Sequence, residues 1–403
     1  MELFSESAAP QWVCKVVRDS TVIGYVVIDS FVGGRASGGV RMLADLDEAE
    51  LRDAARAKTL KHSFFGLPRG GAKAGIYGNP EAPQSERLRL LKEFGQAIAP
   101  LLRARIFAPA PDMGTHNADI EYLRESAGVR VPRRERHTIQ SGVYTALSVF
   151  VGIQRATRRM GLPLSDCRVA IEGFGKVGGS LARVVSEAGA RVVAISTSQG
   201  ALYNPKGLDV ARLTELAAQF GSRLVEHYPD AERLDCAALL ELPVEVLSPC
   251  ARRHSIHSEN VGRVAARIVC PGANNPVSPE AERALLARGV LSVPDFVANC
   301  GGALGATMEY AAIPPTRIAA VLEERLGARM DWVLQTAAEQ NVSPREIAVA
   351  YALRRHAQIQ HAAAHPTLRG ALFEFGQEVY RHGWLPRALV APLSRRYFER
   401  MIG

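Results

Sequence analysis

The sequence predicts an α/β protein with two domains around a cleft, one of them built on a doubly wound parallel sheet. Apolar, strand-like segments alternate with helical segments from about residue 141 to residue 300, a pattern typical of a parallel sheet. After residue 302 the pattern is helical almost to the end of the chain. We therefore place the parallel-sheet domain at residues 141–300. A second α/β domain is expected at residues 1–140, with the C-terminal helices of residues 301–403 packing back on it.

The N-terminal segment mixes short strands, glycine-rich stretches and helices. We interpret its two glycine-rich stretches as loops, because glycine is the strongest local breaker of regular structure. A helix with acidic residues in its first turn lies between the two loops, and another follows the second. The expected strands are 12–17 and 22–28, the glycine loops 33–39 and 66–75, the helices 47–61 and 86–102, and a proline-bounded segment 109–115.

The remainder of the chain supplies the alternating elements and the final helices. We assign no catalytic role to the basic tail at residues 365–403. The expected helices are 142–160, 177–188, 317–341 and 344–364, and the expected strands are 168–171, 191–195, 244–247, 267–269 and 290–293.

Composition excludes several classes of protein. The 403 residues are 47% hydrophobic and 22% charged, and no apolar run approaches the roughly 18 to 20 residues of a membrane span. The net charge of +8 comes from arginines spread between acidic residues along the chain, which favours solvated surfaces over a nucleic-acid site. The six cysteines stand singly, without a CxxC pair. We therefore expect no metal site, no disulfide framework and a cytoplasmic location.

Residues 173–178 form a GxGxxG run, which alone is weak evidence because glycine-rich turns are common. Here an apolar strand precedes the run, a helix begins at it and a second strand follows. Gly173 allows a tight turn, Gly175 a close approach of a pyrophosphate, and Gly178 the packing of helix on strand, while helix N-terminal amides hold the charge. The run predicts a Rossmann-type site for NAD or NADP. The expected contacts are Gly173, Phe174, Gly175, Lys176, Val177 and Gly178.

The end of the second strand bears on the choice of cofactor. An acidic residue usually stands there and binds the ribose hydroxyls, but this strand ends in Ser196-Thr197-Ser198. A carboxylate would repel a 2′-phosphate, whereas a hydroxyl can donate a hydrogen bond to it. The sequence therefore favours NADP over NAD, with Thr197 as a cofactor contact. The alternative is that Thr197 serves NAD without the usual acid.

Two lysines and an aspartate form the second candidate constellation. Lys61 closes a predicted helix, Lys73 lies among glycines, and Asp112 lies among prolines. Two lysines in one cleft depress each other's pKa, and a lysine tuned towards neutrality is a competent general acid and base. Taken singly, each residue also has a purely structural interpretation, as a helix cap, a solvated loop residue and a turn cap.

The combination of motifs resembles the glutamate/leucine/phenylalanine/valine dehydrogenase family, in the family's order from about residue 33 to residue 309. The resemblance implies a reversible, NAD(P)-dependent oxidative deamination of an L-2-amino acid to the 2-oxo acid and ammonia, by a homo-oligomer. The matching segments are Gly38-Gly39-Val40-Arg41-Met42, the two lysine segments, Pro109-Ala110-Pro111-Asp112, the GxGxxG run, residues 271–276 and residues 293–302.

The resemblance also implies residue roles. Lys61 is expected to bind the substrate α-carboxylate, Lys73 to activate water, and Asp112 to exchange protons with the substrate amino group. A fixed cation for the carboxylate and a tuned base beside the reacting carbon are what this chemistry requires. Further binding residues implied by the matching segments are Gly39 and Asn275 for the substrate, and Asn274 and Asn299 for the cofactor.

The sequence departs from the family at positions that set side-chain specificity. Members that use glutamate have a lysine where this chain has Ser37 and a serine where it has Ala306. Burying a second carboxylate without a cation would be costly. The wall of the pocket would be Ser37, Ala110, Ala303 and Ala306, all small, which favours a bulky or apolar side chain, as in the leucine and phenylalanine enzymes, over glutamate.

Other departures keep a different class of function open. A family threonine near the nicotinamide is replaced by Ile139, with Thr138 adjacent. Together with Thr197, this leaves the alternative of a catalytically impaired relative that binds a nucleotide or an amino acid as a regulatory subunit. The retained Lys61, Lys73 and Asp112 favour the enzyme. The expected partners are thus a small-molecule substrate and further copies of the chain, with no nucleic acid and no membrane.

Overall fold

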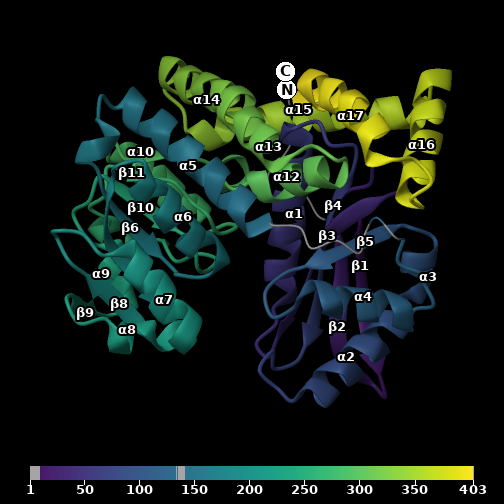
Figure 1. The fold of residues 1–403 in the computed structure, drawn as a ribbon, viewed down its shortest axis with the longest axis horizontal. Coiled ribbons are helices and arrows are strands. Elements are labelled where there is room, and N and C mark those ends of the chain that lie inside the picture. The colour runs from purple at the N-terminus through teal and green to yellow at the C-terminus, as the bar shows by residue number, and fades with distance from the viewer. Residues whose placement is uncertain (1–9, 133, 135–140, 403) are drawn as a thin grey trace. The chain divides into compact units, whose positions relative to one another are not determined.

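The computed structural model describes residues 10–132, 134 and 141–402, and its chain divides into two compact units (Figure 1). The first unit comprises Met1–Ile139, Tyr310–Ala312 and Val349–Met401, and the second comprises Gln140–Glu309, Ile313–Ala348 and Ile402–Gly403. Residues 301–309 and 313–348, which we expected to complete the first domain, therefore cluster with the second unit. Ile139 and Thr138 lie outside the described residues.

The first unit is built on a five-stranded mixed sheet in the order β1-β2-β4-β3-β5. β3 pairs in parallel with both β4 and β5, whereas β2 pairs antiparallel with β1 and β4. The strands are β1 (Trp12–Arg18), β2 (Thr21–Ile28), β3 (Ala36–Leu43), β4 (Gly70–Tyr77) and β5 (Phe107–Pro111).

Three of these strands lie where the sequence analysis expected loops or a proline-bounded segment. β3 and β4 are strands despite their glycines, because neighbouring backbone lies too close for side chains. A Cβ on Gly38 would lie 1.6 Å from the carbonyl oxygen of Ala72, and one on Gly71 would lie 2.2 Å from the amide nitrogen of Thr59. β5 tolerates its prolines because it is an edge strand.

The helices of this unit come from the N-terminal segment and from the C-terminal part of the chain. α1 begins at the N-cap Asp47, whose carboxylate accepts a hydrogen bond from the amide of Ala49, and it carries acidic residues in its first turn. No helix among the described residues is both long and apolar enough to cross a membrane. The helices are α1 (Glu48–Phe64), α2 (Gln84–Ala97), α3 (Ala99–Arg103), α4 (Asn117–Ser126), α15 (Pro344–Ala364), α16 (Leu368–Arg381) and α17 (Arg387–Ile402).

The second unit contains a seven-stranded sheet in the order β12-β11-β10-β6-β7-β8-β9. The first five strands of this order are parallel, and β8 and β9 add an antiparallel edge that the sequence did not predict. The strands are β6 (Arg168–Glu172), β7 (Arg191–Thr197), β8 (Gly200–Tyr203), β9 (Glu232–Leu234), β10 (Val246–Pro249), β11 (Ile268–Val269) and β12 (Leu291–Ser292).

Both faces of this sheet are buried, as a doubly wound fold requires. Val169 and Ile171 of β6 join one apolar core with α5 and α6, while Ala170 between them joins another with α9 and α10. The fold class predicted from the sequence is confirmed. The helices are α5 (Ser141–Arg159), α6 (Lys176–Glu187), α7 (Val210–Phe220), α8 (Leu224–His227), α9 (Cys236–Leu240), α10 (Pro279–Ala287), α11 (Asp295–Ala298), α12 (Gly301–Tyr310), α13 (Pro315–Val321) and α14 (Gly327–Gln340), with a π-helical turn η5 (Leu322–Leu326) and 3-10 turns η2 (Leu164–Asp166), η3 (Gly221–Arg223) and η4 (Val261–Arg263).

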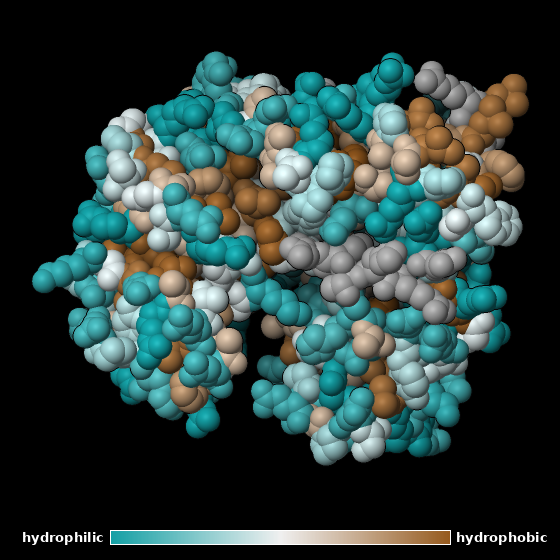
Figure 2. Space-filling model, viewed as in Figure 1, coloured by the Kyte–Doolittle hydropathy of each residue, from teal (hydrophilic) through white to brown (hydrophobic). Residues whose placement is uncertain are grey.

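The basic tail of the sequence forms α16 and α17, and these helices and the turn between them expose large apolar side chains. Figure 2 shows brown residues gathered at the upper right, where Figure 1 places α16. Where exposed apolar side chains adjoin one another, they mark interaction sites or aggregation liabilities in globular proteins. The side chains are Leu368, Leu372, Phe373, Phe375, Trp384, Leu389 and Leu393.

Candidate active site

Lys73 and Asp112 form an ion pair in the first unit, although they come from strands that are not neighbours in the sheet. Lys73 lies on β4 and Asp112 directly follows β5, with β3 between the two. The ammonium contacts Oδ2 of the carboxylate. Lys73 thus lies in a strand and not in the loop that its glycine neighbours suggested.

A glycine on β3 leaves room for this pair. Gly39 lies opposite Ala110 in the β3–β5 register, and a Cβ there would lie 2.7 Å from the Cβ of Asp112 and 3.1 Å from its Oδ2. A side chain at Gly39 would therefore displace the carboxylate from Lys73. This clearance gives Gly39 a physical role at the site beside the substrate contact that the sequence suggested.

The backbone around Asp112 is fixed by Thr115. Its hydroxyl donates to the carbonyl oxygen of Val40 at 2.7 Å and accepts a hydrogen bond from the amide of Asp112 at 2.9 Å. Gly114 adopts a φ of 73°, and a Cβ there would lie 2.2 Å from the carbonyl oxygen of Met42. The turn after β5 is therefore tied to β3 at several points, which holds the carboxylate in one place.

Arg41 is a third member of this cluster. In the sequence it was visible only as part of the Gly38–Met42 motif, without a role of its own. Its Nε donates to Oδ2 of Asp112 at 3.3 Å, and its Nη1 contacts the carboxylate of Glu50. The guanidinium is almost fully buried, with 4% of the side chain exposed. A buried arginine that holds a carboxylate on one side and is itself paired on the other fixes the orientation of Asp112.

The electrostatics of the pair tune Lys73. Burial lowers the pKa of Lys73, Asp112 opposes this shift, and the charges of Arg41 and Lys61 add to it, so the pKa falls to about 8. Burial raises the pKa of Asp112, but the charges of Lys73 and Arg41 lower it by more. The net pKa of Asp112 is therefore well below its usual range. At neutral pH the carboxylate is therefore ionised, while a fraction of Lys73 is neutral and can accept a proton.

The last turns of α1 bring further cations to β4. Lys61 and His62 are buried there, and Nδ1 of His62 faces the carbonyl oxygen of Gly70 at 3.2 Å. Burial lowers the pKa of His62 well below its ordinary value, so the imidazole is neutral. Lys61 lies within electrostatic range of Lys73, as the sequence predicted, and a second lysine, Lys58, stands one turn earlier on the same helix.

The expected pocket wall is divided between the two units. Ser37 is half-buried on β3 and Ala110 is exposed on β5, both in the first unit. Ala303 and Ala306 are half-buried, one turn apart on α12, in the part of this helix that belongs to the second unit.

The GxGxxG run has the geometry of a dinucleotide-binding turn. It joins the end of β6 to the N-terminus of α6, with Gly173 at a φ of 89°. A Cβ on Gly178 would lie 1.8 Å from the carbonyl oxygen of Gly173, whereas one on Gly175 would meet nothing within 4 Å. The N-cap of α6 is Gly175, which has no side chain to accept hydrogen bonds from the first amides of the helix. These amides fit an anionic group such as a pyrophosphate. Phe174, Lys176 and Val177 complete the run.

Glu172 adds a carboxyl directly before this turn that the sequence analysis did not consider. Burial raises its pKa to about 7, while the nearby Ser255 hydroxyl and the charge of Arg252 lower it. Its Oε2 is buried without a hydrogen-bond partner among the described residues. With this pKa the carboxyl is only about half ionised at pH 7, and it opposes a bound pyrophosphate less than a fully ionised carboxylate would.

The asparagines of the second unit are held in a common network. The Nδ2 of Asn299 donates to the carbonyl oxygen of Ala273 at 2.7 Å and to Oδ1 of Asn274 at 3.1 Å, while Asp295 accepts the amide of Asn275 at 2.9 Å. Asn275 has a φ of 49°. Asn299 is buried, and its Oδ1 finds no hydrogen-bond partner in the described part of the chain. This orphaned acceptor fits a carboxamide donor such as that of nicotinamide.

Thr197 lies at the end of β7, but its hydroxyl is already engaged. It donates to the carbonyl oxygen of Ser222 at 2.7 Å and accepts from the amide of Gln199 at 3.1 Å. Because a hydroxyl has one proton, Thr197 in this arrangement has none to give to a 2′-phosphate. The donor role that the sequence analysis gave to Thr197 therefore has no support in this geometry.

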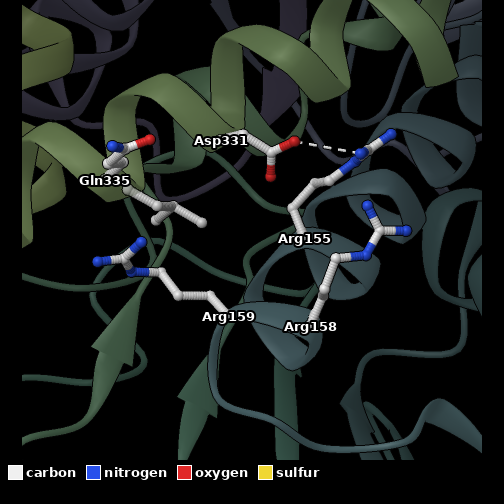
Figure 3. Close-up of a pocket in the computed structure, with 6 residues that line it drawn as sticks. Arg155, Arg158, Arg159, Asp331 and Gln335 are labelled. Carbon is white, nitrogen blue, oxygen red and sulfur yellow. Dashed lines mark hydrogen bonds and ion pairs between the residues drawn. The ribbon is translucent and has the colours of Figure 1, made fainter.

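A separate hollow of about 400 Å³ in the second unit contains none of the predicted site residues. It is lined from α5 by Arg155, Arg158 and Arg159 and from α14 by Asp331, Leu334 and Gln335 (Figure 3). Arg155 donates to Asp331 at 3.1 Å and to the carbonyl oxygen of Glu323, in the π-helical turn, at 3.0 Å. Arg155 therefore ties α5 to α14 and η5.

A Rossmann-type sheet with a dinucleotide turn and a tuned lysine–aspartate pair define the class of nicotinamide-dependent dehydrogenases. Two family models match the chain: "Glu/Leu/Phe/Val dehydrogenase, dimerisation domain" at residues 11–127, and "Glutamate/Leucine/Phenylalanine/Valine dehydrogenase" at residues 140–363. The chain belongs to this family. The resemblance inferred from the motifs is thereby confirmed, as is the class of enzyme, an NAD(P)-dependent amino-acid dehydrogenase that acts on CH–NH2 donors.

Individual relatives agree with this assignment. The chain is 35% identical over 306 residues to a glutamate dehydrogenase of Thermotoga maritima, covering 71% of this chain and 72% of the relative. It is 29% identical over 358 residues to an NAD-specific glutamate dehydrogenase of Staphylococcus aureus, covering 84% and 85%. A leucine-bound, hetero-hexameric glutamate dehydrogenase of Thermus thermophilus has a TM-score of 0.76 at 28% identity, covering 87% and 89%.

Proposed function

We propose that this chain catalyses the reversible oxidative deamination of an L-2-amino acid to its 2-oxo acid and ammonia, with NAD or NADP as the cofactor. The observation that carries the proposal is the buried Lys73–Asp112 pair, in which Lys73 has a pKa of about 8. A lysine poised near neutrality beside an ionised carboxylate is suited to accept and return protons at neutral pH.

The residues divide the chemistry as follows. Lys61 holds the α-carboxylate of the amino acid, and this fixed cation orients the Cα–H bond. When bound, the nicotinamide supplies the acceptor for the hydride that leaves Cα. Neutral Lys73 takes a proton from the water that attacks the resulting iminium carbon, and Asp112 exchanges protons with the departing amine. Arg41 keeps Asp112 ionised and in position.

A spectrophotometric panel tests this proposal. The 20 standard amino acids, each with NAD and with NADP, should include at least one pair that generates reduced nicotinamide, and the matching 2-oxo acid with ammonium should consume it. The alternative is a catalytically impaired subunit, which would bind cofactor or amino acid in calorimetry but turn over none of the panel. The intact Lys73–Asp112–Arg41 cluster favours the enzyme, because a disused site has no reason to keep buried charges.

The cofactor would be held by the glycine turn, the N-terminus of α6, Asn274 and Asn299. We propose NADP as the preferred form. The end of β7 carries no carboxylate to repel a 2′-phosphate, and the exposed Arg223 follows directly after Ser222, which accepts the Thr197 hydroxyl. An arginine near this strand end is the usual partner of a 2′-phosphate.

Thr197→Asp tests the strand end. We expect the carboxylate to repel a 2′-phosphate and to shift the ratio of kcat/KM values towards NAD, by about 1–3 kcal/mol. The matched control is Thr197→Val, which removes the hydroxyl without adding charge. It should leave the ratio unchanged, because the hydroxyl is bonded within the protein. If Asp and Val give the same ratio as threonine, residue 197 does not face the ribose.

Lys61→Ala tests the proposed carboxylate ligand. We expect KM for the amino acid to rise by at least about tenfold, because one partner of a buried charge pair is lost, while the Kd of the cofactor stays the same. If Lys61 instead only complements the C-terminal dipole of α1, the substitution would cost about 0.3–1 kcal/mol of stability and leave KM unchanged. Steady-state kinetics and thermal melting together separate the two roles.

The side chain of the substrate depends on which cations line the pocket. The small residues Ser37, Ala110, Ala303 and Ala306 favour a bulky or apolar side chain, provided that no other cation reaches it. Lys58 lies within electrostatic range of Lys61 and Lys73, so the absence of a cation at Ser37 does not by itself decide against an acidic side chain.

Self-association of the chain is also part of the proposal. The matching N-terminal model is described as a dimerisation domain, and the Thermus thermophilus relative is a hetero-hexamer. Light scattering on the purified chain should give a mass that is a multiple of 43.6 kDa. The cytoplasmic location inferred from the single cysteines stays a prediction.

A further inference from the structure

Lys58 stands on the part of α1 that packs most closely on β4. A Cβ on Gly71 of β4 would lie 2.2 Å from the amide nitrogen of Thr59 and 2.5 Å from the carbonyl oxygen of Ala55, so this turn of the helix rests directly on the strand. Lys73 follows two residues later on the same strand. Lys58 and Lys61 are three residues apart and so share one face of α1. The fold therefore brings three lysines of α1 and β4 together.

Lys58 differs from Arg56 and Lys73 in having no hydrogen-bond or ion-pair partner among the described residues. The half-buried Lys58 makes no hydrogen bond or ion pair within residues 10–132, 134 and 141–402. By contrast, its neighbour Arg56 pairs with Asp29 at 3.5 Å, and Lys73 pairs with Asp112. Because Lys58 is half-buried, it keeps some contact with water, but an ammonium among other cations still favours an anionic ligand that the described residues do not supply.

The charges around Lys58 show what kind of ligand fits. Burial lowers the pKa of Lys58, and the positive charges of Lys61 and Lys73 lower it further. The carboxylate of Asp112 raises this pKa, whereas the charge of Arg69 lowers it. The resulting pKa of Lys58 is about 7. The ammonium therefore lies in range of three other cations and one carboxylate. Asp112 already compensates Lys73 and Arg41. A substrate α-carboxylate bound by Lys61 would still leave Lys58 itself without an anion among the described residues.

We propose that Lys58 is a specificity-determining residue that binds a second anionic group, carried on the substrate side chain, so that the substrate is an acidic 2-amino acid. This proposal rests on the proposed function, since it assigns a substrate class to the same site. Lys58 supplies the cation that is missing at Ser37, from a helix rather than from β3. The small residues at Ser37 and Ala110 then give space for the side chain instead of marking an apolar wall.

The test compares selectivity in wild type and in Lys58→Met, which keeps the length of the side chain and removes its charge. The substrates are glutamate and aspartate against leucine and phenylalanine, with kcat and KM measured separately. Wild type should prefer an acidic substrate. In Lys58→Met, the ratio of kcat/KM values for acidic over apolar substrates should fall at least about tenfold, mainly through a higher KM for the acidic substrate.

A control variant and an independent binding measurement accompany this test. Lys92→Met removes an exposed lysine from α2 of the same unit and should leave the ratio unchanged. Binding is measured independently of turnover by calorimetry with cofactor present, using glutarate and the monocarboxylate pentanoate as probes. Glutarate should bind more tightly than pentanoate to wild type, and this advantage should vanish in Lys58→Met. Thermal melting should show the variant to be at least as stable as wild type, because an unpaired charge is removed.

The outcomes separate this inference from the proposed function. If wild type turns over leucine or phenylalanine better than any acidic amino acid, the enzyme is established and the inference is wrong. If Lys58→Met weakens acidic and apolar substrates equally, Lys58 acts on the shared α-carboxylate or on Lys73, which also overturns the inference. If wild type turns over no amino acid, the proposed function fails, while the comparison of glutarate with pentanoate still decides whether Lys58 binds a second anion.

Discussion

Lys73→Ala is expected to lower kcat for amino-acid oxidation by about 10²–10⁴-fold, the usual contribution of one general acid–base group. The loss should fall on the chemical step, because Lys73 handles the protons of the attacking water while Lys61 holds the carboxylate. The fold should survive. Asp112 keeps its hydrogen bond from Arg41 at 3.3 Å, so the truncation does not leave a carboxylate without any cation.

The pH profile of wild type should carry the signature of the same residue. Since the pKa of Lys73 is lowered to about 8 and the neutral amine is the active base, oxidation should rise with pH through about 8 and level off above it. In Lys73→Ala this limb should disappear. The control is Lys92→Ala, on the exposed face of α2. Near-normal kcat in Lys73→Ala, with the pH limb retained, would remove Lys73 from the mechanism.

The sequence predicted the parallel-sheet unit well because its signals are local. Each strand such as β6 or β7 is a short apolar run, buried on both faces, between helices of clear amphipathic pattern. The antiparallel strands β8 and β9 escaped prediction because they are short, with four and three residues, and of mixed composition; β9 is the edge strand. The GxGxxG run was recognisable for the same local reason, since its glycines meet steric requirements within one turn.

The first unit was harder to predict because long-range contacts decide its structure. Glycines and prolines in β3, β4 and β5 indicated loops, yet the glycines are there because β3, β4 and α1 pack backbone to backbone. Lys58 escaped notice for a related reason. No pattern in the sequence shows that Lys58 lies near Lys61 and Lys73 without an ion-pair partner among the described residues, since that depends on how α1 packs on β4. Arg41 was likewise visible as a motif residue, but its contact with Asp112 was not.

Asp112→Asn is expected to lower kcat by a similar factor, about 10²–10⁴-fold, because the amide cannot exchange protons with the amine. It should also change how Lys73 titrates. The carboxylate raises the pKa of Lys73, so its removal should lower that pKa further, and any residual activity should reach its plateau at a lower pH than in wild type.

The same substitution should destabilise the first unit, which calls for a matched control. Without the carboxylate, Lys73 and Arg41 lose their shared anion, and breaking a buried ion pair in this way costs about 3–5 kcal/mol. Asp119→Asn removes a comparably buried carboxylate that binds Arg87 at 2.8 Å, away from Lys73. It should lower the melting temperature while leaving kcat and its pH dependence unchanged. If both variants lost kcat in proportion to stability alone, Asp112 would be a structural residue, whereas a selective loss in Asp112→Asn, together with the shifted pH limb, places its carboxylate in the proton transfer.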